Sequence, residues 1–137
     1  MTARVEIPVT WGDTDAGGLI YYPRFFHFFV VGLNAYFEPI APHFMQWLRD
    51  RKYVLPSVEA SASFKAPLRA GDTAAVETTV ETVGTSSFTA TFEIERVGDD
   101  VQVARGRVAF VLVDETFDPA SLPDEVHTLV RERAESR

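Results

Sequence analysis

The feature that most constrains this chain is an almost wholly apolar run at residues 24–37, RFFHFFVVGLNAYF, which follows an acidic loop containing glycine. On a helix, apolar side chains would cover most of the circumference, whereas the few polar ones recur at spacings of three and four along one stripe. That stripe contains Arg24, His27, Val31, Asn34 and Glu38. We therefore expect a largely buried helix with a sheet wrapped around it.

Both ends of this helix are marked in the sequence. Pro23 suits the first helical position, because its φ is already helical and its missing N–H would have had no intrahelical partner. Tyr22 is then the predicted N-cap. The helix should end near Phe37, because Pro39 pushes the residue before it out of the helical region. The run is shorter than the roughly 20 apolar residues that cross a membrane, so we expect no membrane partner.

The loop before the helix places a carboxylate near the helix start. Residues 11–26 read WGDTDAGGLIYYPRFF, so Asp15 precedes the helix across a link that contains Gly17 and Gly18. The first N–H groups of a helix lack intrahelical partners, and the helix dipole adds positive potential there. Such N–H groups can hold a developing oxyanion. Because a carboxylate facing them suits acyl chemistry, Asp15 is the candidate catalytic residue.

Composition narrows the class of protein. A chain of 137 residues fits one domain, which we expect to span residues 1–137. The 13 basic and 20 acidic side chains give a net charge of −7, which argues against nucleic acid or an anionic membrane as the partner. The absence of cysteine excludes a thiolate nucleophile and a cysteine-based metal site. The first residues lack the apolar core of a signal peptide, so we expect a cytoplasmic protein.

Alternating apolar and polar residues predict the remaining elements. Two more helices are expected, a short one at about 42–51 and a C-terminal one from near Ser121 or Pro123. Five strands are expected at about 4–11, 58–65, 74–81, 88–95 and 101–114.

The strand patterns also predict which side chains are covered. Trp11 should continue the inward face of the first strand, and the last strand, apolar on both faces, should be central. A second buried face is expected from Val58, Ala60, Ala62 and Phe64.

The order of elements indicates the fold class. Strands that follow strands indicate an antiparallel α+β domain rather than a doubly wound one. An apolar helix against a five-stranded antiparallel sheet is the hot-dog fold, here with a short helix and a C-terminal helix added. Because the long edges of such a sheet are usually covered by association, we expect a homodimer or homotetramer.

The run at residues 11–26 resembles the signature of hot-dog acyl-CoA thioesterases of the 4-hydroxybenzoyl-CoA thioesterase type, a group that includes bacterial short-chain acyl-CoA thioesterases. The likeness extends over about residues 4–115, through the order of elements and the Ala-Ser-Phe-Lys segment at 62–65. It implies hydrolysis of an acyl-CoA, either aromatic such as hydroxybenzoyl-CoA or short-chain, to the free acid and CoA. CoA is then part of the substrate, and neither a cofactor nor a metal is expected.

The resemblance assigns roles to single residues. The second acidic residue of the motif, Asp15, is the implied catalytic carboxylate, and the backbone N–H of Tyr22 is implied to polarise the thioester carbonyl. The strand that begins near Leu55, Pro56 and Ser57 is implied to come from the partner subunit and to line the acyl pocket. The other candidate substrate-binding residues are Gly17, Gly18, Tyr21, Phe25, Phe26, Lys65 and Ser86.

One departure from the family concerns the CoA phosphates. Relatives of the aromatic branch place a basic cluster before a Ser-Phe pair, whereas residues 83–88 here read VGTSSF. The candidates to replace that cluster are Lys65, Arg69, Arg105, Arg107 and the hydroxyls and backbone amides of residues 84–87.

Several alternatives stay open at this point. Asp15, ionised at neutral pH, can attack the carbonyl carbon to form a mixed anhydride or can deprotonate a water. A non-catalytic hot-dog module that binds acyl thioesters remains the second interpretation, and a dehydratase could use only His27. Ser86 and Ser87 lack the Gly-x-Ser-x-Gly elbow, which argues against a serine hydrolase. Asp13 is expected to bond the amides of its own loop.

Overall fold

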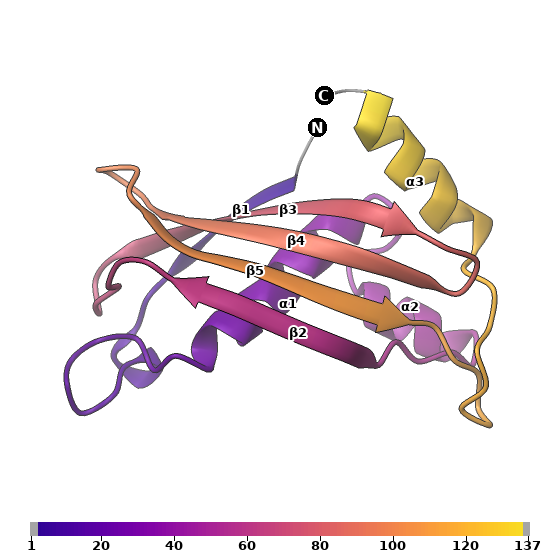
Figure 1. Cartoon of the computed structure of the whole chain (residues 1–137), viewed down its shortest axis with the longest axis horizontal. Helices are drawn as coiled ribbons and strands as arrows, with labels where there is room; N and C mark the ends of the chain where they lie inside the picture. Colours follow the sequence, from indigo (N-terminus) through magenta and orange to yellow (C-terminus); the bar gives the residue numbers. More distant parts are fainter. Residues whose placement is uncertain (1–2, 136–137) are drawn as a thin grey trace.

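The computed structural model describes residues 3–135 and contains one five-stranded antiparallel sheet and three helices (Figure 1). The strands lie in the order β1-β3-β4-β5-β2, so β1 and β2 are the two edges. The strands are β1 (Ala3–Pro8), β2 (Ser57–Phe64), β3 (Thr73–Val83), β4 (Ser87–Arg96) and β5 (Gln102–Val111). The helices are α1 (Arg24–Phe37), α2 (Phe44–Asp50) and α3 (Asp124–Glu135).

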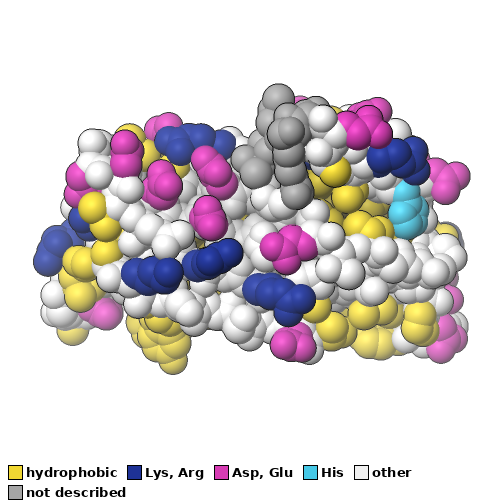
Figure 2. All heavy atoms as spheres, turned by 45° about the horizontal axis from the view of Figure 1, so that its top comes forward, with side chains coloured by type: hydrophobic (Ala, Val, Ile, Leu, Met, Phe, Trp, Pro, Cys, Tyr) yellow, Lys and Arg dark blue, Asp and Glu magenta, His cyan; other side chains and the backbone are white. Residues whose placement is uncertain are grey.

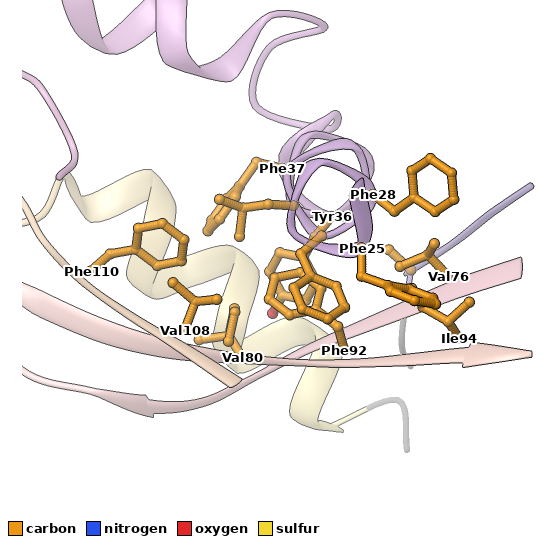
Figure 3. Close-up of a cluster of buried hydrophobic side chains, with 14 of the residues drawn as sticks. Phe25, Phe28, Tyr36, Phe37, Val76, Val80, Phe92, Ile94, Val108 and Phe110 are labelled. Atoms are coloured by element: carbon orange, nitrogen blue, oxygen red, sulfur yellow. The ribbon is translucent and has the colours of Figure 1, made fainter. Parts of the chain in front are cut away.

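Helix α1 lies across one face of the sheet, mainly against β1 and β3, with further contacts to β4 and β5. Phe25 and Tyr36 point from α1 toward apolar side chains of the strands (Figure 3). Each large apolar side chain buried in this way stabilises the fold by about 1.5–3 kcal/mol. The buried residues of α1 are Phe25, Phe28, Phe29, Gly32, Leu33, Tyr36 and Phe37. The predicted buried helix is therefore confirmed, with His27 and Val30 exposed on its outer side.

The close approach of α1 to the sheet depends on Gly106 in β5. The ring of Phe29 stacks on Phe92 with centroids 4.7 Å apart and also covers Gly106. A Cβ at position 106 would overlap that ring, so only glycine lets the helix sit this close.

The predicted buried face of β2 is wrong. Ala62 is half-buried, whereas Val58 is 61% and Phe64 47% exposed, and Ala60 is exposed as well. The reason is the position of β2 at the sheet edge beyond the main contacts of α1. In the single chain, β2 therefore presents both an apolar face and an unpaired backbone edge.

Two other expectations about the strands need correction. Strand β1 ends at Pro8 and the chain turns into a 3₁₀ helix at Trp11–Asp13, which leaves Trp11 86% exposed instead of facing inward. Strand β5 is interior but not central, because it lies between β4 and the edge strand β2. The middle strand is β4.

The C-terminal helix α3 lies over one end of the molecule (Figure 1). Arg133 fixes it there, because one guanidinium nitrogen donates to the carbonyl of Tyr36 at 2.9 Å and the guanidinium carbon lies 4.5 Å from the centre of the Tyr36 ring. Within residues 3–135, no helix has the length and apolar character needed to cross a membrane.

Replacing Gly106 with alanine should lower the free energy of unfolding by about 1–3 kcal/mol, because the added methyl group overpacks the Phe29 ring. Chemical denaturation followed by circular dichroism measures the change. Gly12→Ala is the matched control, since a Cβ there meets only the Thr10 hydroxyl at 4.0 Å. Equal stability of Gly106→Ala and wild type would contradict the close packing of α1 on β5.

Candidate active site

The loop between β1 and α1 folds back as a small hairpin. Thr14 and Ile20 form an isolated antiparallel β-bridge, and the Asp15 N–H donates to the carbonyl of Leu19 at 2.8 Å. The Tyr21 N–H donates to the carbonyl of Asp13 at 2.8 Å. These bonds turn the chain back on itself after Asp13 and Asp15. One short hairpin therefore connects Asp15 to Tyr22, which lies just before the helix start.

Asp13 fastens this hairpin to the helix. Its carboxylate is buried and accepts hydrogen bonds from the N–H and the hydroxyl of Thr10, at 2.8 and 3.0 Å. Arg24, the first residue of α1, donates to the other carboxylate oxygen through Nε at 3.0 Å and Nη2 at 2.8 Å. The predicted structural role of Asp13 is confirmed, and it includes a charge pair to α1 as well as the loop amide.

The charge state of Asp13 depends on these bonds. Burial by itself raises the pKa of Asp13, but the hydrogen bonds from Thr10 and Arg24 and the positive charge of Arg24 outweigh burial. The net effect is a pKa below the usual aspartate value. Asp13 is therefore ionised throughout the neutral pH range and keeps its ion pair with Arg24.

Asp15 differs from Asp13 in both burial and partners. Its side chain is exposed, and its Oδ1 accepts the Gly17 N–H at 2.8 Å. That bond fixes one carboxylate oxygen and leaves the other open. Gly18 has a φ of +81°, which favours glycine and lets the loop turn back.

Asp15 is one of the residues that line a surface hollow of about 610 Å³. The hollow contains one acidic side chain and a nearly fully exposed tryptophan. Its lining residues are Trp11, Gly12, Thr14, Asp15, Ala16, Gly18 and Ala70. Trp11 was missed as a site residue, because its alternation with the β1 residues indicated an inward side chain.

The start of α1 differs from the sequence prediction. Pro23, not Tyr22, occupies the cap position, with φ −64° and ψ −19°. The N–H groups of residues 24–26 are not free, since they donate to the carbonyls of residues 21–23 at 2.8, 3.2 and 3.1 Å. This 3₁₀-like turn tightens the helix start and satisfies donors that an isolated helix would leave open.

The N–H of Tyr22 stands outside this turn. In the described part of the chain it has no hydrogen-bond acceptor, and Pro23 has no N–H at all. Within residues 3–135, the helix start therefore offers one free backbone donor rather than the expected group of several.

An exposed aromatic cluster surrounds this donor. Tyr22 contacts Tyr21 and Phe64 edge-on, with centroids 5.7 and 6.1 Å apart, and Phe64 stacks on Phe25 at 5.0 Å. Tyr21, Tyr22 and Phe64 are about half exposed, whereas Phe25 belongs to the core. Phe26 is half-buried and packs on Phe29 instead. Phe64 was missed as a site residue, because only the tertiary fold brings the end of β2 to the start of α1.

The other predicted site residues are divided between the two ends of the sheet. Lys65 directly follows Phe64, and its Nζ donates to Gln102 at 3.1 Å. Ser86 lies in the β3–β4 turn at the opposite end of the sheet from the Asp15 loop (Figure 1). Leu55, Pro56 and Ser57 lie at that opposite end too, where β2 begins (Figure 1).

The histidines do not form a metal site in the described chain. Within residues 3–135, no three or more potential ligands of the His, Cys, Asp and Glu types come together. His27 is exposed one turn into α1, with its ring 6.4 Å from that of Phe28, and no hydrogen bond joins it to Asp15 among the described residues.

Comparison with known proteins gives a consistent family. Residues 9–129 match the family model described as "Thioesterase-like superfamily". The chain is 32% identical over 80 residues to YneP of Bacillus subtilis (strain 168), by its name a proposed acyl-CoA thioesterase, and this match spans 58% of the chain and only 56% of YneP. It is 27% identical over 124 residues to a 1,4-dihydroxy-2-naphthoyl-CoA hydrolase of Nostoc punctiforme (strain ATCC 29133 / PCC 73102), spanning 86% of the chain and 79% of that protein.

The fold has a close match among solved structures. A 1,4-dihydroxy-2-naphthoyl-CoA thioesterase from Synechocystis superposes with a TM-score of 0.89 at 24% identity, over 96% of this chain and 97% of that one. The predicted hot-dog fold class is thus confirmed.

Replacing Asp13 with asparagine should lower the free energy of unfolding at pH 7 by about 2–3 kcal/mol, because the charge-assisted bonds from Thr10 and Arg24 are lost. The lowered pKa of Asp13 makes this contribution complete above the unfolded-state pKa of about 3.9, and it is lost as pH falls through the folded-state pKa. The gap between wild type and Asp13→Asn should therefore close in acid.

Denaturation curves at several pH values between 7 and 2 measure this gap. Asp50→Asn is the control, since Asp50 is exposed and its carboxylate accepts a hydrogen bond from the Gln46 side chain, and its effect should stay within about 0.5 kcal/mol. A gap that is absent at pH 7, or that does not change with pH, would contradict the role of the ionised Asp13 carboxylate.

Proposed function

The chain belongs to the thioesterase-like superfamily, and from that premise we propose that it is an acyl-CoA thioesterase that hydrolyses acyl-CoA to the free acid and CoA. One observation carries the proposal. The exposed Asp15 carboxylate is oriented by the Gly17 N–H and lines a surface hollow. Its loop is joined to the helix start by the Asp13–Arg24 ion pair, and there the Tyr22 N–H has no acceptor in the described chain.

The two groups meet the needs of thioester hydrolysis. The carbonyl carbon must be attacked, and negative charge that develops on the carbonyl oxygen must be stabilised. Asp15 supplies the attacking or proton-accepting oxygen. The Tyr22 N–H supplies the donor to the carbonyl oxygen, aided by the positive end of the α1 dipole.

Asp15 can act by two routes. As a nucleophile, its free oxygen bonds to the carbonyl carbon, the carbon–sulfur bond breaks, CoA leaves as the thiolate, and water then hydrolyses the mixed anhydride. As a general base, it takes a proton from the water that attacks the same carbon. Both routes use the oxygen that Gly17 leaves open.

The surroundings favour a flat or short acyl group. Trp11 and the cluster of Tyr21, Tyr22 and Phe64 offer exposed aromatic surface beside the two reacting groups. Aromatic faces and edges stack well with an aryl ring. The names of the Nostoc and Synechocystis relatives refer to an aromatic acyl-CoA, which supports the same class. No group besides the substrate is required by this chemistry.

The exposed edge strand supports a homodimer. Two copies of β2 paired antiparallel about a twofold axis would cover both the free backbone edge and the apolar face. Such a pairing places the start of one β2 beside the end of the other. Leu55, Pro56 and Ser57 of one subunit would then lie near Phe64 and the helix start of its partner, and the acyl pocket would be shared.

Replacing Asp15 with asparagine should reduce thioester hydrolysis by at least about 100-fold, because the reacting oxygen loses its charge. Release of free thiol from benzoyl-, hydroxybenzoyl-, phenylacetyl- and short aliphatic CoA esters measures the rate. Stability and CoA affinity should stay at wild-type values, since Asp15 is exposed and, within residues 3–135, its side chain accepts a hydrogen bond only from the Gly17 N–H. Asp50→Asn serves as the control, and wild-type rates in Asp15→Asn would end the assignment.

Replacing Val58 with lysine should convert the dimer to a folded monomer with little hydrolase activity, because the charge interrupts the apolar face of β2. Sedimentation velocity gives the mass, and the thiol assay gives the activity of the same sample. Val101→Lys is the matched control, since Val101 is a partly exposed valine outside β2. A monomeric wild type, or a dimeric and active Val58→Lys, would contradict the shared site.

A further inference from the structure

The peptide group that joins Tyr21 to Tyr22 contains the backbone donor of the proposed chemistry, because its N–H is the Tyr22 N–H. Its carbonyl oxygen, which belongs to Tyr21, accepts the Arg24 N–H at 2.8 Å in the turn that starts α1. In a planar trans peptide, the C=O and N–H bonds point in opposite directions. Since the oxygen points into the first turn of the helix, the Tyr22 N–H points away from it.

The same segment is also held from the side of the loop. The Tyr21 N–H donates to the carbonyl of Asp13 at 2.8 Å. The carboxylate of Asp13 accepts Nε and Nη2 of Arg24 at 3.0 and 2.8 Å. These contacts close a ring that runs from the Arg24 side chain through Asp13 and Tyr21 back to the Arg24 N–H. The direction of the Tyr22 N–H therefore depends on every member of this ring.

The ion pair in the ring differs from the other ion pairs of the described chain. Figure 2 shows basic and acidic side chains interspersed over one face of the molecule. In the other ion pairs within residues 3–135, the carboxylate side chain is at least 40% exposed, whereas that of Asp13 is 8% exposed. Water screens exposed pairs, but a buried carboxylate that loses its partner keeps an uncompensated charge. The pair of Asp13 with Arg24 therefore holds the helix start more firmly than a surface pair would.

The geometry of the guanidinium suits a positioning task. Nε and Nη2 of Arg24 both contact Oδ1 of Asp13, whereas Oδ2 accepts the two bonds from Thr10. Two donors of one rigid fork fix the orientation of the side chain as well as its distance, which a lysine ammonium does not do. Arg24 is not among the residues that line the hollow beside Asp15.

We propose that Arg24 is a positioning residue for thioester hydrolysis, which holds Asp13 and through it the Tyr21–Tyr22 peptide, so that the Tyr22 N–H faces the substrate carbonyl oxygen. The proposal rests on the proposed thioesterase function and adds to it a residue that acts without touching the substrate. No bond to Arg24 forms or breaks in the reaction. Its effect on the rate is nevertheless large, because a misplacement of about 1 Å in an active site can cost about 100-fold.

Amide hydrogen exchange tests the ring without any substrate. Arg24→Met keeps the aliphatic stem but removes the donors to Asp13, so the Tyr21 N–H should exchange at least about tenfold faster than in wild type. The N–H groups of the middle strand β4 are the internal control and should exchange at wild-type rates. Arg24→Gln, which keeps one neutral donor, serves the same tests if the methionine variant does not stay folded.

Kinetics with the CoA esters named above test the consequence for the reaction. In Arg24→Met, kcat should fall about 100-fold while KM stays within about twofold, because the donor acts on charge that develops in the transition state. Arg24→Lys should recover about tenfold of this loss. The double variant Asp13→Asn/Arg24→Met should lose no more than Arg24→Met alone, since the two residues act as one unit. Arg4→Met removes an exposed arginine paired with Glu6 and should match wild type.

Several results would overturn the positioning role of Arg24. They are wild-type exchange of the Tyr21 N–H in Arg24→Met, an unchanged kcat, or losses that multiply in the double variant. A higher KM at unchanged kcat would make Arg24 a substrate contact, which contradicts the proposal as well. If the wild-type protein hydrolyses none of the esters, the thioesterase function fails, whereas the exchange rates still decide whether Arg24 fixes the peptide.

Discussion

The contact on which the site depends is the ion pair between the buried Asp13 carboxylate and Arg24. It joins the loop that carries Asp15 to the first residue of α1, through a carboxylate that also accepts two bonds from Thr10. The surrounding loop is exposed and contains Gly17 and Gly18, so it has few apolar contacts of its own to hold it. The relative position of a carboxylate and a backbone donor must be fixed for acyl chemistry, and this pair supplies that rigidity.

The burial of α1 sets where the chemistry can occur. Because nearly the whole helix packs on the sheet, only its start and its outer stripe meet solvent. The start carries the exposed aromatic cluster and the Tyr22 N–H, which has no acceptor within residues 3–135. Meanwhile β2 leaves an open edge beside the same helix start, so one copy of the chain holds only part of the surroundings of the proposed acyl pocket.

The sequence predicts features that depend on local pattern. Helix α1, the five strands and the structural role of Asp13 follow from periodicity and from turn chemistry, which neighbouring residues determine. The exposure of β2 could not be predicted, since alternation shows that a face is apolar and does not show what covers it. The contact between Phe64 and Tyr22 is tertiary, so the local pattern does not contain it. The outward Trp11 and the Pro23 cap come from short 3₁₀ turns at residues 11–13 and 24–26, which alternation and N-cap preference do not predict.

The most direct measurement is a crystal structure of the protein with a CoA analogue in which a methylene group separates the acyl carbonyl from sulfur and prevents hydrolysis. The proposed chemistry predicts the ketone oxygen at about 2.7–3.1 Å from the Tyr22 nitrogen, and an Asp15 oxygen at about 3–3.5 Å from the ketone carbon on its opposite side. A ketone bound away from both groups, or held at the Tyr22 N–H with Asp15 pointing elsewhere, would contradict the assignment of Asp15 and Tyr22 as the reacting pair.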